Sequence, residues 1–431
     1  MFACSYYPDD DSDFVEEARR EAEKAVRRLR NHPCVALWCG NNENQWLHHD
    51  LQQEGGAPER CLGGRIYDEV LPEVCGRLDP GTPYWPSSPY GGDEPNSEWE
   101  GDRHAWDVSI RAQTVAEKVD YGAYERDRGK FITEFGVLAP APLESVRRYL
   151  PHGELNRESA CWAFHNNEFE QGTLREALKR YWRPAEGLSL AEYVRMGQTI
   201  QAEALKLALE HWRRRKFRTA GALFWMYADC WGEVGWTVID YYLERKPSYW
   251  AVRRAFAPVL PSFAGREDGG MALWIVNDLP RAVEVELQYG WLHLPTGETE
   301  RRRMRRRAPR NGAEEVARLS PPGGEPEEWM AFVRLEGREC GDIFNRRFPA
   351  GFDFNRIPLP EAHVECALSD GGDELVVTAD AFAWQVHLKV PRGVEVGDND
   401  FDLMPGETRR VEVRGPRGMK DQVEAGALNG P

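Results

Sequence analysis

The chain has 431 residues, which exceeds a usual single domain and favours two or three domains. Its formal net charge of -16 argues against a nucleic-acid partner, because a polyanion is best bound by a basic surface. Hydrophobic residues make up 41% of the chain and 16 residues are tryptophan, so a large core can form with aromatic rings left over, as in many sugar-binding sites.

The 9 cysteines show no CxxC pair and no repeated spacing, so neither a disulfide framework nor a zinc site is indicated. This usage favours a reducing compartment, and we expect a cytoplasmic protein. No window approaches the length of a membrane span and no signal peptide precedes Phe2, so we expect no membrane partner.

The first predicted element is a helix over residues 13–30, in which apolar residues recur at intervals of three and four after a capping-box pattern at Asp13 and Glu16. The run NHPCVALWCGNNEN follows. Its residues 35–38 are apolar without polar alternation, which indicates a parallel strand buried on both faces. The next expected elements are strands at 82–85, 105–108 and 130–135, a long helix at about 190–215 and a strand at 220–225.

Alternating strands and helices predict a parallel sheet with crossover connections. Only about five strands can be counted, whereas a closed α/β barrel has eight. We therefore expect residues 1–257 to form part of a (β/α)8 TIM barrel, about strands four to eight. The opening MFACSYYP is apolar and ends in proline, as though the chain starts inside an element, and we expect Met1 to be internal to a longer protein.

After about Pro258 the pattern changes to short alternating segments separated by Gly, Pro and Asp, which is typical of all-β domains. We expect two immunoglobulin-like β-sandwich domains, at 258–350 and at 351–431 with a C-terminal tail. The basic run RRRMRRR at 301–307 is compatible with a nucleic-acid patch or with a solvated edge strand or loop. Flanking acidic stretches favour the edge strand or loop.

Two predicted strands end in a glutamate. Glu43 follows GNN, and Glu134 lies in KFITEFG, 91 positions later (134 minus 43) and thus about three βα steps of roughly thirty residues away. The two carboxylates are expected to face one another across the mouth of the barrel. Glycoside hydrolysis needs such a pair, because one carboxyl group protonates the leaving oxygen while the other attacks the anomeric carbon.

These segments resemble those of the β-mannosidases of glycoside hydrolase family two. NHPCVALWCGNNEN, FITEFG and GALFWMYADCWGEVGWTVIDY look like the acid/base, nucleophile and eighth-strand segments, and VGDNDFDLMPGE resembles the closing sandwich domain. The resemblance covers nearly the whole chain. It implies that a jelly-roll domain, a first sandwich and three barrel strands of that family precede the part represented here.

By this resemblance Glu43 would be the general acid/base and Glu134 the nucleophile of a retaining mechanism, with their carboxyl groups roughly 5 to 5.5 Å apart. Asn42 would hydrogen-bond the substrate 2-hydroxyl group, and Trp225 would form the floor of the first sugar subsite. The alternatives are a loop amide for Asn42 and a barrel-core ring for Trp225.

The resemblance also makes Trp106 a substrate contact on the sixth strand. Where the family commonly continues with another tryptophan and a histidine, this chain has Ser109 and Ile110, so we expect one sugar-contacting ring to be absent. No cofactor and no metal are expected. His48 and His49 follow Glu43 but lack a third ligand at a suitable spacing.

The expected function is therefore that of a retaining exo-β-mannosidase, which removes terminal non-reducing β-D-mannose from oligosaccharides. An exo-β-glucosaminidase is an alternative that the double asparagine before Glu43 disfavours. A non-catalytic remnant that binds carbohydrate or another protein is the second alternative. The expected partner is a β-mannoside oligosaccharide, with a homodimer as the candidate assembly.

Overall fold

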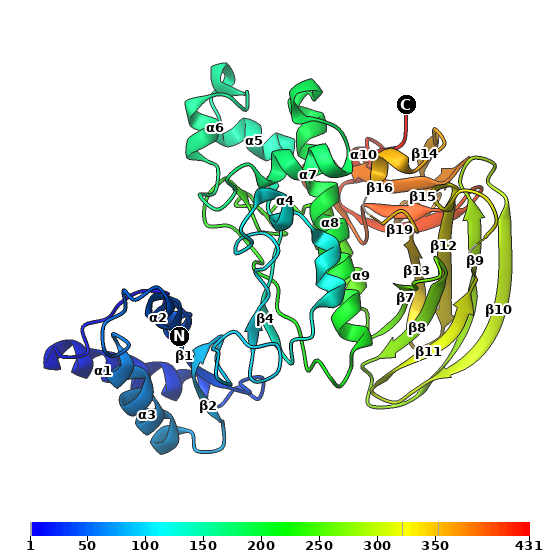
Figure 1. Ribbon diagram of the computed structural model, residues 1–431. Helices are drawn as coiled ribbons and strands as arrows, with labels where there is room; N and C mark the ends of the chain where they lie inside the picture. The colour runs from blue at the N-terminus through cyan, green and yellow to red at the C-terminus, as the bar shows by residue number, and fades with distance from the viewer. Residues whose placement is uncertain (1, 321, 352) are drawn as a thin grey trace. The chain divides into compact units, whose positions relative to one another are not determined.

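The computed structural model describes residues 2–320, 322–351 and 353–431 (Figure 1). The chain forms two compact units. The first contains Met1–Trp106, Asp127–Phe135 and Arg218–Phe224, and the second contains Asp107–Arg126, Gly136–Phe217 and Trp225–Pro431. Within the described part of the chain, every helix is too short or too polar to cross a membrane.

The first unit opens with helix α1 (Ser12–Leu29). Its N-cap is Asp11, whose carboxylate accepts hydrogen bonds from the backbone of Asp13 and Phe14, so the predicted capping box beginning at Asp13 is wrong. The apolar face of α1 packs against a π-helical turn and helix α3. The other helices of this unit are the π-helix Ile66–Val70, α2 (Asn44–Gln53) and α3 (Leu71–Leu78).

Four short strands of the first unit form two parallel pairs, which agrees with the predicted parallel arrangement. Strand β1 (Trp38–Asn42) pairs with β2 (Tyr84–Ser88). Strand β3 (Arg103–His104) pairs with β4 (Ile132–Glu134). The parallel pairing brings the C-terminal ends of both members of each pair to the same edge.

Strand β1 begins three residues later than predicted, at Trp38 rather than Val35. The Phe2 N–H donates to the Gly40 carbonyl over 2.8 Å, and the Asn42 N–H donates to the Phe2 carbonyl over 2.8 Å. These bonds extend the strand into the polar motif. The hydrophobic pattern therefore located the strand but not its polar end.

Two other predicted strands are corrected. The strand predicted at 105–108 lies instead at β3, where buried Arg103 and His104 carry no apolar signal. The strand predicted at 220–225 is reduced, in the described chain, to one parallel bridge between Ala222 and Ile132.

The longest helix described in the second unit is α8 (Leu190–Arg214), which confirms the helix predicted at about 190–215. It begins with a capping box formed by Ser189 and Glu192. Helix α8 packs along α9 (Pro247–Ala255). Short elements complete this part: α4 (Val115–Lys118), α5 (Leu143–Tyr149), α6 (Ala160–Phe164), α7 (Thr173–Tyr181), β5 (Ala139–Pro140), β6 (Val234–Gly235) and the 3-10 turns Tyr121–Arg126, His152–Glu154 and Ala185–Gly187.

Two stacked antiparallel sheets follow α9 (Figure 1). One has the order β11-β8-β7 and the other β10-β9-β12-β13, and their facing apolar side chains form one core. The strands are β7 (Val259–Gly265), β8 (Met271–Asn277), β9 (Val283–His293), β10 (Thr299–Ala308), β11 (Gly312–Leu319), β12 (Trp329–Gly337) and β13 (Gly341–Arg347), with a 3-10 turn at Pro326–Glu328.

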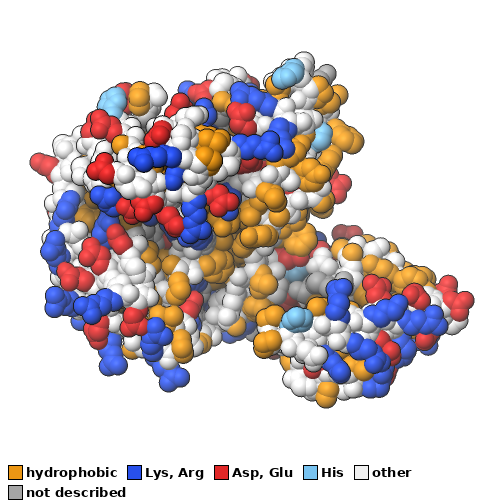
Figure 2. Space-filling model, turned by 180° about the vertical axis from the view of Figure 1, so that it is seen from behind, with side chains coloured by type: hydrophobic (Ala, Val, Ile, Leu, Met, Phe, Trp, Pro, Cys, Tyr) orange, Lys and Arg blue, Asp and Glu red, His pale blue; other side chains and the backbone are white. Residues whose placement is uncertain are grey.

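The arginine run lies on β10, an exposed edge strand, as predicted. Arg305 and Arg307 form ion pairs of 3.5 and 3.8 Å with Glu286 and Glu284 of the neighbouring strand β9. Acidic and basic side chains are interspersed over the face of the molecule shown in Figure 2. Charged side chains on an edge strand discourage pairing with other chains.

A second pair of sheets closes the chain. One has the order β14-β15-β19-β17 and the other β18-β16-β20, around a separate apolar core. The elements are β14 (Val364–Leu368), β15 (Glu374–Ala379), β16 (Ala383–Lys389), β17 (Glu395–Val396), β18 (Phe401–Leu403), β19 (Thr408–Arg414), β20 (Glu424–Gly426), α10 (Arg417–Lys420) and the 3-10 turn Phe354–Arg356.

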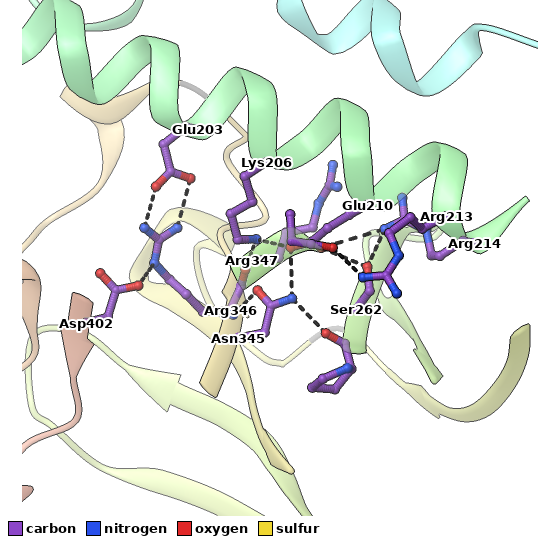
Figure 3. Close-up of polar contacts among 12 residues, drawn as sticks. Glu203, Lys206, Glu210, Arg213, Arg214, Ser262, Asn345, Arg346, Arg347 and Asp402 are labelled. Carbon is purple, nitrogen blue, oxygen red and sulfur yellow. Dashed lines mark hydrogen bonds and ion pairs between the residues drawn. The ribbon is translucent and has the colours of Figure 1, made fainter. Parts of the chain in front are cut away.

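Buried charges join α8 to both sandwiches within the second unit (Figure 3). Arg346, only 3% exposed, donates to the Glu203 carboxylate of α8 over 2.6 Å and to Asp402 over 2.8 Å. Burial raises the pKa of Glu203, but the charge of Arg346 and its hydrogen bonds outweigh burial, so the pKa lies below its usual value. A second carboxylate of α8, Glu210, accepts hydrogen bonds from Ser262 over 2.7 Å and from Asn345 over 2.9 Å.

Replacing Arg346 with Ala should destabilise the second unit by about 3 to 5 kcal/mol, because two carboxylates lose their buried counter-charge. Urea unfolding followed by tryptophan fluorescence measures this loss. The matched control is Arg305→Ala on the exposed strand β10, which should leave the transition midpoint unchanged. Equal midpoints for Arg346→Ala and the unchanged chain would contradict the prediction.

The same network predicts acid sensitivity. Because the folded-state pKa of Glu203 is depressed, its contribution is complete above the unfolded value of about 4.3 and is lost as pH falls toward the folded value. As the pH is lowered below that value, the free energy of unfolding should therefore fall less for Arg346→Ala than for the unchanged chain. Urea unfolding repeated at decreasing pH measures this difference.

Candidate active site

Glu43 is held at the end of β1 by a tight turn into α2. Its backbone is left-handed (φ 62°) and its N–H donates to the Ser88 carbonyl over 2.8 Å. Buried Asn41 supports this turn, since its side-chain oxygen accepts from the Asn44 N–H over 3.0 Å and from the Ser87 hydroxyl over 2.7 Å. Two asparagines of the GNNEN motif therefore have structural roles: Asn41, and Asn44, whose side-chain oxygen accepts from the Ser5 N–H over 2.8 Å.

The remaining asparagine, Asn42, has no side-chain hydrogen bond among the described residues. It lies beside Glu43 at the end of β1 and is partly exposed. Its amide is therefore free to bind a ligand at the edge where Glu43 projects.

Glu134 is the last residue of β4, and its side chain is 12% exposed. The buried Trp106 donates its indole N–H to Glu134 Oε2 over 3.1 Å. The structure thus brings Trp106 to the predicted nucleophile. Because its N–H is used and only 4% of the residue is exposed, Trp106 supports Glu134 more directly than it offers a surface to a sugar.

His104 lies between the two glutamates and was missed in the sequence. Its Nδ1 is 2.7 Å from Glu43 Oε1 and 3.3 Å from Glu134 Oε2, and the side chain is fully buried. The contacting atoms of the three residues lie within 4.8 Å of one another. The only sequence signal was a histidine two positions before Trp106, in a segment with no strand-like pattern.

A layer of polar residues supports this histidine. Its Nε2 is 3.1 Å from the Ser88 hydroxyl, and Ser88 in turn contacts the buried carboxylate of Asp102. Asp102 also accepts from the Trp85 indole over 3.0 Å and from the Thr133 hydroxyl over 2.7 Å. The site is therefore built on the ends of β1, β2, β3 and β4 within the first unit.

The surroundings of Glu134 alter its pKa strongly. Burial raises the pKa of Glu134 to about 7, against the lowering effect of His104, while the negative charge of Glu43 raises it further. The Trp106 hydrogen bond favours the ionised form of Glu134 and Asp102 opposes it. A nucleophile needs the ionised form of its carboxyl group, and the groups that favour this form of Glu134 are His104 and the Trp106 indole.

Glu43, His104 and Glu134 are also the one group of at least three metal-ligand residues found in the described part of the chain. A metal would need the lone pair of His104 Nδ1. That nitrogen lies 2.7 Å from Glu43 Oε1 and 3.3 Å from Glu134 Oε2, so the three side chains already contact one another at hydrogen-bond distance. His48 lies apart from this group and contacts Gln52 over 3.0 Å.

Trp225 belongs to the second unit, where its side chain is exposed (41%). Its predicted role below the sugar stays a prediction. The structure thus brings Glu43, Glu134 and Trp106 together with Asn42 at the edge of one unit, and it adds His104, Ser88 and Asp102.

Comparison with known proteins agrees with the predicted resemblance. Residues 358–428 match a family model described as an Ig-fold domain of mannosidases. Proteins named beta-mannosidase B from Aspergillus clavatus and Aspergillus niger are each 27% identical to the chain, over 96% and 97% of its length. The chain spans 52% of each of these relatives, about half their length.

Solved structures give the same result. The β-D-mannosidase of Dictyoglomus thermophilum matches 100% of this chain and 52% of its own, with 33% identity and a TM-score of 0.88. The exo-chitosanase CsxA of Amycolatopsis orientalis matches 97% of this chain with a TM-score of 0.68, but at 16% identity it supports only the fold. The resemblance to β-mannosidases therefore extends over nearly the whole chain.

Replacing Trp106 with Phe should raise the pKa of Glu134 by about one unit, because a hydrogen bond to a charged group contributes about 1.5 kcal/mol. A pH titration of glutamate carboxyl carbons by NMR measures the shift, with Glu134→Gln identifying the resonance. Trp99→Phe, at an exposed tryptophan of the same unit, is the control and should leave the titration unchanged. An unchanged Glu134 titration in Trp106→Phe would count against the hydrogen bond.

Proposed function

We propose that this chain is the C-terminal portion of a retaining exo-β-mannosidase of glycoside hydrolase family two, which hydrolyses terminal non-reducing β-D-mannose residues of oligosaccharides. The observation that carries the proposal is the pair of carboxylates at the ends of β1 and β4. Oxygen atoms of Glu43 and Glu134 lie within 4.8 Å of each other. This fits the short spacing of retaining glycosidases, which leaves no room for a water molecule between the nucleophile and the sugar.

In the first step Glu134 attacks the anomeric carbon while the protonated carboxyl group of Glu43 gives its proton to the leaving oxygen. The glycosidic C–O bond breaks and an ester bond to Glu134 forms. In the second step Glu43 takes a proton from water, whose oxygen attacks the same carbon and releases Glu134. The side chains of Glu43 and Glu134 are 20% and 12% exposed, so both remain accessible to a sugar.

The remaining substrate contacts are proposed on weaker support. Asn42 has a free amide beside Glu43 and is suited to bind the 2-hydroxyl group, where a hydrogen bond can strengthen in the transition state. By the resemblance alone, Trp225 would stack on the sugar. Trp106 would act through Glu134.

For the architecture, we propose that β1, β2, β3, β4 and the segment at 220–225 are strands four to eight of a (β/α)8 barrel within residues 1–257. The two sandwiches would then be domains at 258–350 and 351–431. The parallel pairings of the first unit support the barrel, and the two sheet pairs after α9 support the division of the remainder.

The relative from Aspergillus clavatus and the solved structure from Dictyoglomus thermophilum are both named as β-mannosidases. The match to the exo-chitosanase CsxA is a likeness of fold alone. An exo-β-mannosidase is therefore the favoured function over an exo-β-glucosaminidase. The non-catalytic alternative is decided by experiment.

The test is hydrolysis of p-nitrophenyl β-D-mannopyranoside by the chain itself and by the chain joined to the N-terminal half of the Dictyoglomus thermophilum enzyme. Activity is expected in the joined protein. Glu134→Gln should reduce kcat by on the order of 10^4-fold, because the covalent step loses its nucleophile. Glu59→Gln, an exposed residue of the first unit, should have no effect.

Glu43 is tested separately. With a dinitrophenyl leaving group, which needs no proton, Glu43→Ala should accumulate the glycosyl-enzyme, and added azide should release it as β-mannosyl azide. A folded joined protein that is inactive on the β-mannoside, or Glu134→Gln with full activity, would sink the proposal. Faster hydrolysis of the β-glucosaminide would favour the alternative enzyme.

A further inference from the structure

The candidate active site also has the side chains of a transition-metal site. In the described part of the chain, one group of three His, Cys, Asp or Glu residues has its ligand atoms within 4.8 Å of one another, and it consists of Glu43, His104 and Glu134. An imidazole nitrogen and carboxylate oxygens are ordinary ligands of zinc. The group therefore offers three ligands, one nitrogen and two oxygens, to a single ion.

The spacing of these atoms fits zinc. His104 Nδ1 lies 2.7 Å from Glu43 Oε1 and 3.3 Å from Glu134 Oε2. The ligands of a tetrahedral zinc ion lie roughly 2.0 to 2.2 Å from the metal and hence roughly 3.3 to 3.6 Å from one another. The contact with Glu134 already has this length, and Glu43 needs to withdraw by less than about 1 Å to match it.

The site suits a metal whichever group carries the hydrogen between His104 and Glu43. A metal ion takes the place of that hydrogen and uses a lone pair of Nδ1, so the remaining ring hydrogen lies on Nε2. Nε2 is 3.1 Å from the hydroxyl oxygen of Ser88, which can accept this hydrogen, and Ser88 in turn contacts the buried Asp102 carboxylate. Histidines that bind metals generally donate their second N–H to such a partner.

The two carboxylates gain from a cation between them. Burial raises the pKa of Glu134, and the negative charge of Glu43 raises it further, because like charges lie close together in a partly buried site. A divalent ion offsets this repulsion. The Trp106 indole donates to Glu134 Oε2 over 3.1 Å and so holds the oxygen that would bind the ion.

The three residues leave the fourth position of a tetrahedral ion to solvent. The side chains of Glu43 and Glu134 are 20% and 12% exposed, so an ion can reach them from outside. Cys4 hydrogen-bonds Glu43, but it lies outside the group of atoms within 4.8 Å of one another. Three protein ligands with an open fourth position are typical of zinc that exchanges its remaining ligand.

We propose that Glu43, His104 and Glu134 bind a zinc ion reversibly, and that bound zinc inhibits the enzyme by occupying the two carboxylates that the reaction needs. Zinc is an inhibitor in this scheme and takes no part in catalysis. The inhibition rests on the proposed function, whereas the binding of zinc to the chain does not depend on activity.

Binding is tested by calorimetric titration of the full chain with Zn²⁺. One ion should bind with a dissociation constant on the order of micromolar, and Mg²⁺ should not bind, because it prefers six oxygen ligands. Glu43→Gln and Glu134→Gln each remove one charged ligand and should weaken binding by at least about tenfold, and Ser88→Ala should weaken it about tenfold through the ring. Cys4→Ser, next to the site, is the matched control and should leave the affinity unchanged.

Urea unfolding of each variant shows whether it is folded. Failure of the unchanged chain to bind Zn²⁺, or an affinity that both glutamine variants leave unaltered, would overturn the proposal whether or not the chain is active. A loss in Cys4→Ser as large as that in Glu134→Gln would overturn it too, because the ion would then have a different set of ligands.

Inhibition is tested in the joined protein with p-nitrophenyl β-D-mannopyranoside. Zn²⁺ should raise the apparent KM and leave kcat unchanged, because the ion and the sugar compete for the same carboxylates, and EDTA should restore the original KM. A fall in kcat at constant KM would contradict inhibition at this site. An inactive joined protein would count against the proposed function alone, and the titration of the chain with Zn²⁺ would still decide whether the site exists.

Discussion

Three carboxylates around one buried imidazole are the constraint on which the site depends. Glu43, Glu134 and Asp102 would repel each other in a partly buried pocket, and His104 and the Trp106 indole are the groups that offset this repulsion. Charges removed from water are stable only when they are paired and hydrogen-bonded. The polar ends of β1 to β4 therefore form a connected network, and loss of one member affects the others.

This network explains why the strands of the first unit are short and end in polar residues. Backbone pairing fixes where Glu43, Ser88, His104 and Glu134 lie at the ends of the strands. A turn supported by buried Asn41 directs Glu43 toward the imidazole ring of His104. Regular backbone pairing thus sets the geometry, and Ser88 and Asp102 behind the site hold the His104 ring in place. Rigid support of this kind holds the proposed catalytic groups in position before the reaction, so no free energy of reorganisation is needed during it.

The second unit also contains a network of buried paired charges, which connects structural elements instead of supporting the candidate site. Arg346 holds carboxylates from α8 and from the last sandwich, which ties a helix and two separate apolar cores together. Such a buried pair contributes little net stability compared with apolar packing, but removing one partner is costly. It therefore specifies how these elements join, while the cores supply the stability.

The sequence by itself determined the features that depend on local pattern: the two glutamates at strand ends, the long helix α8, the edge strand of arginines and the all-β character after residue 258. These features can be predicted from sequence because they depend on residues that are close to one another in the chain. Only the tertiary structure decided that His104 joins Glu43 to Glu134, that Trp106 donates to Glu134 and that Ser88 and Asp102 support the ring. These residues lie in or next to different strands and use buried polar groups, so no pattern of hydrophobicity could reveal their contacts. Only the parallel pairing brings them within hydrogen-bond distance.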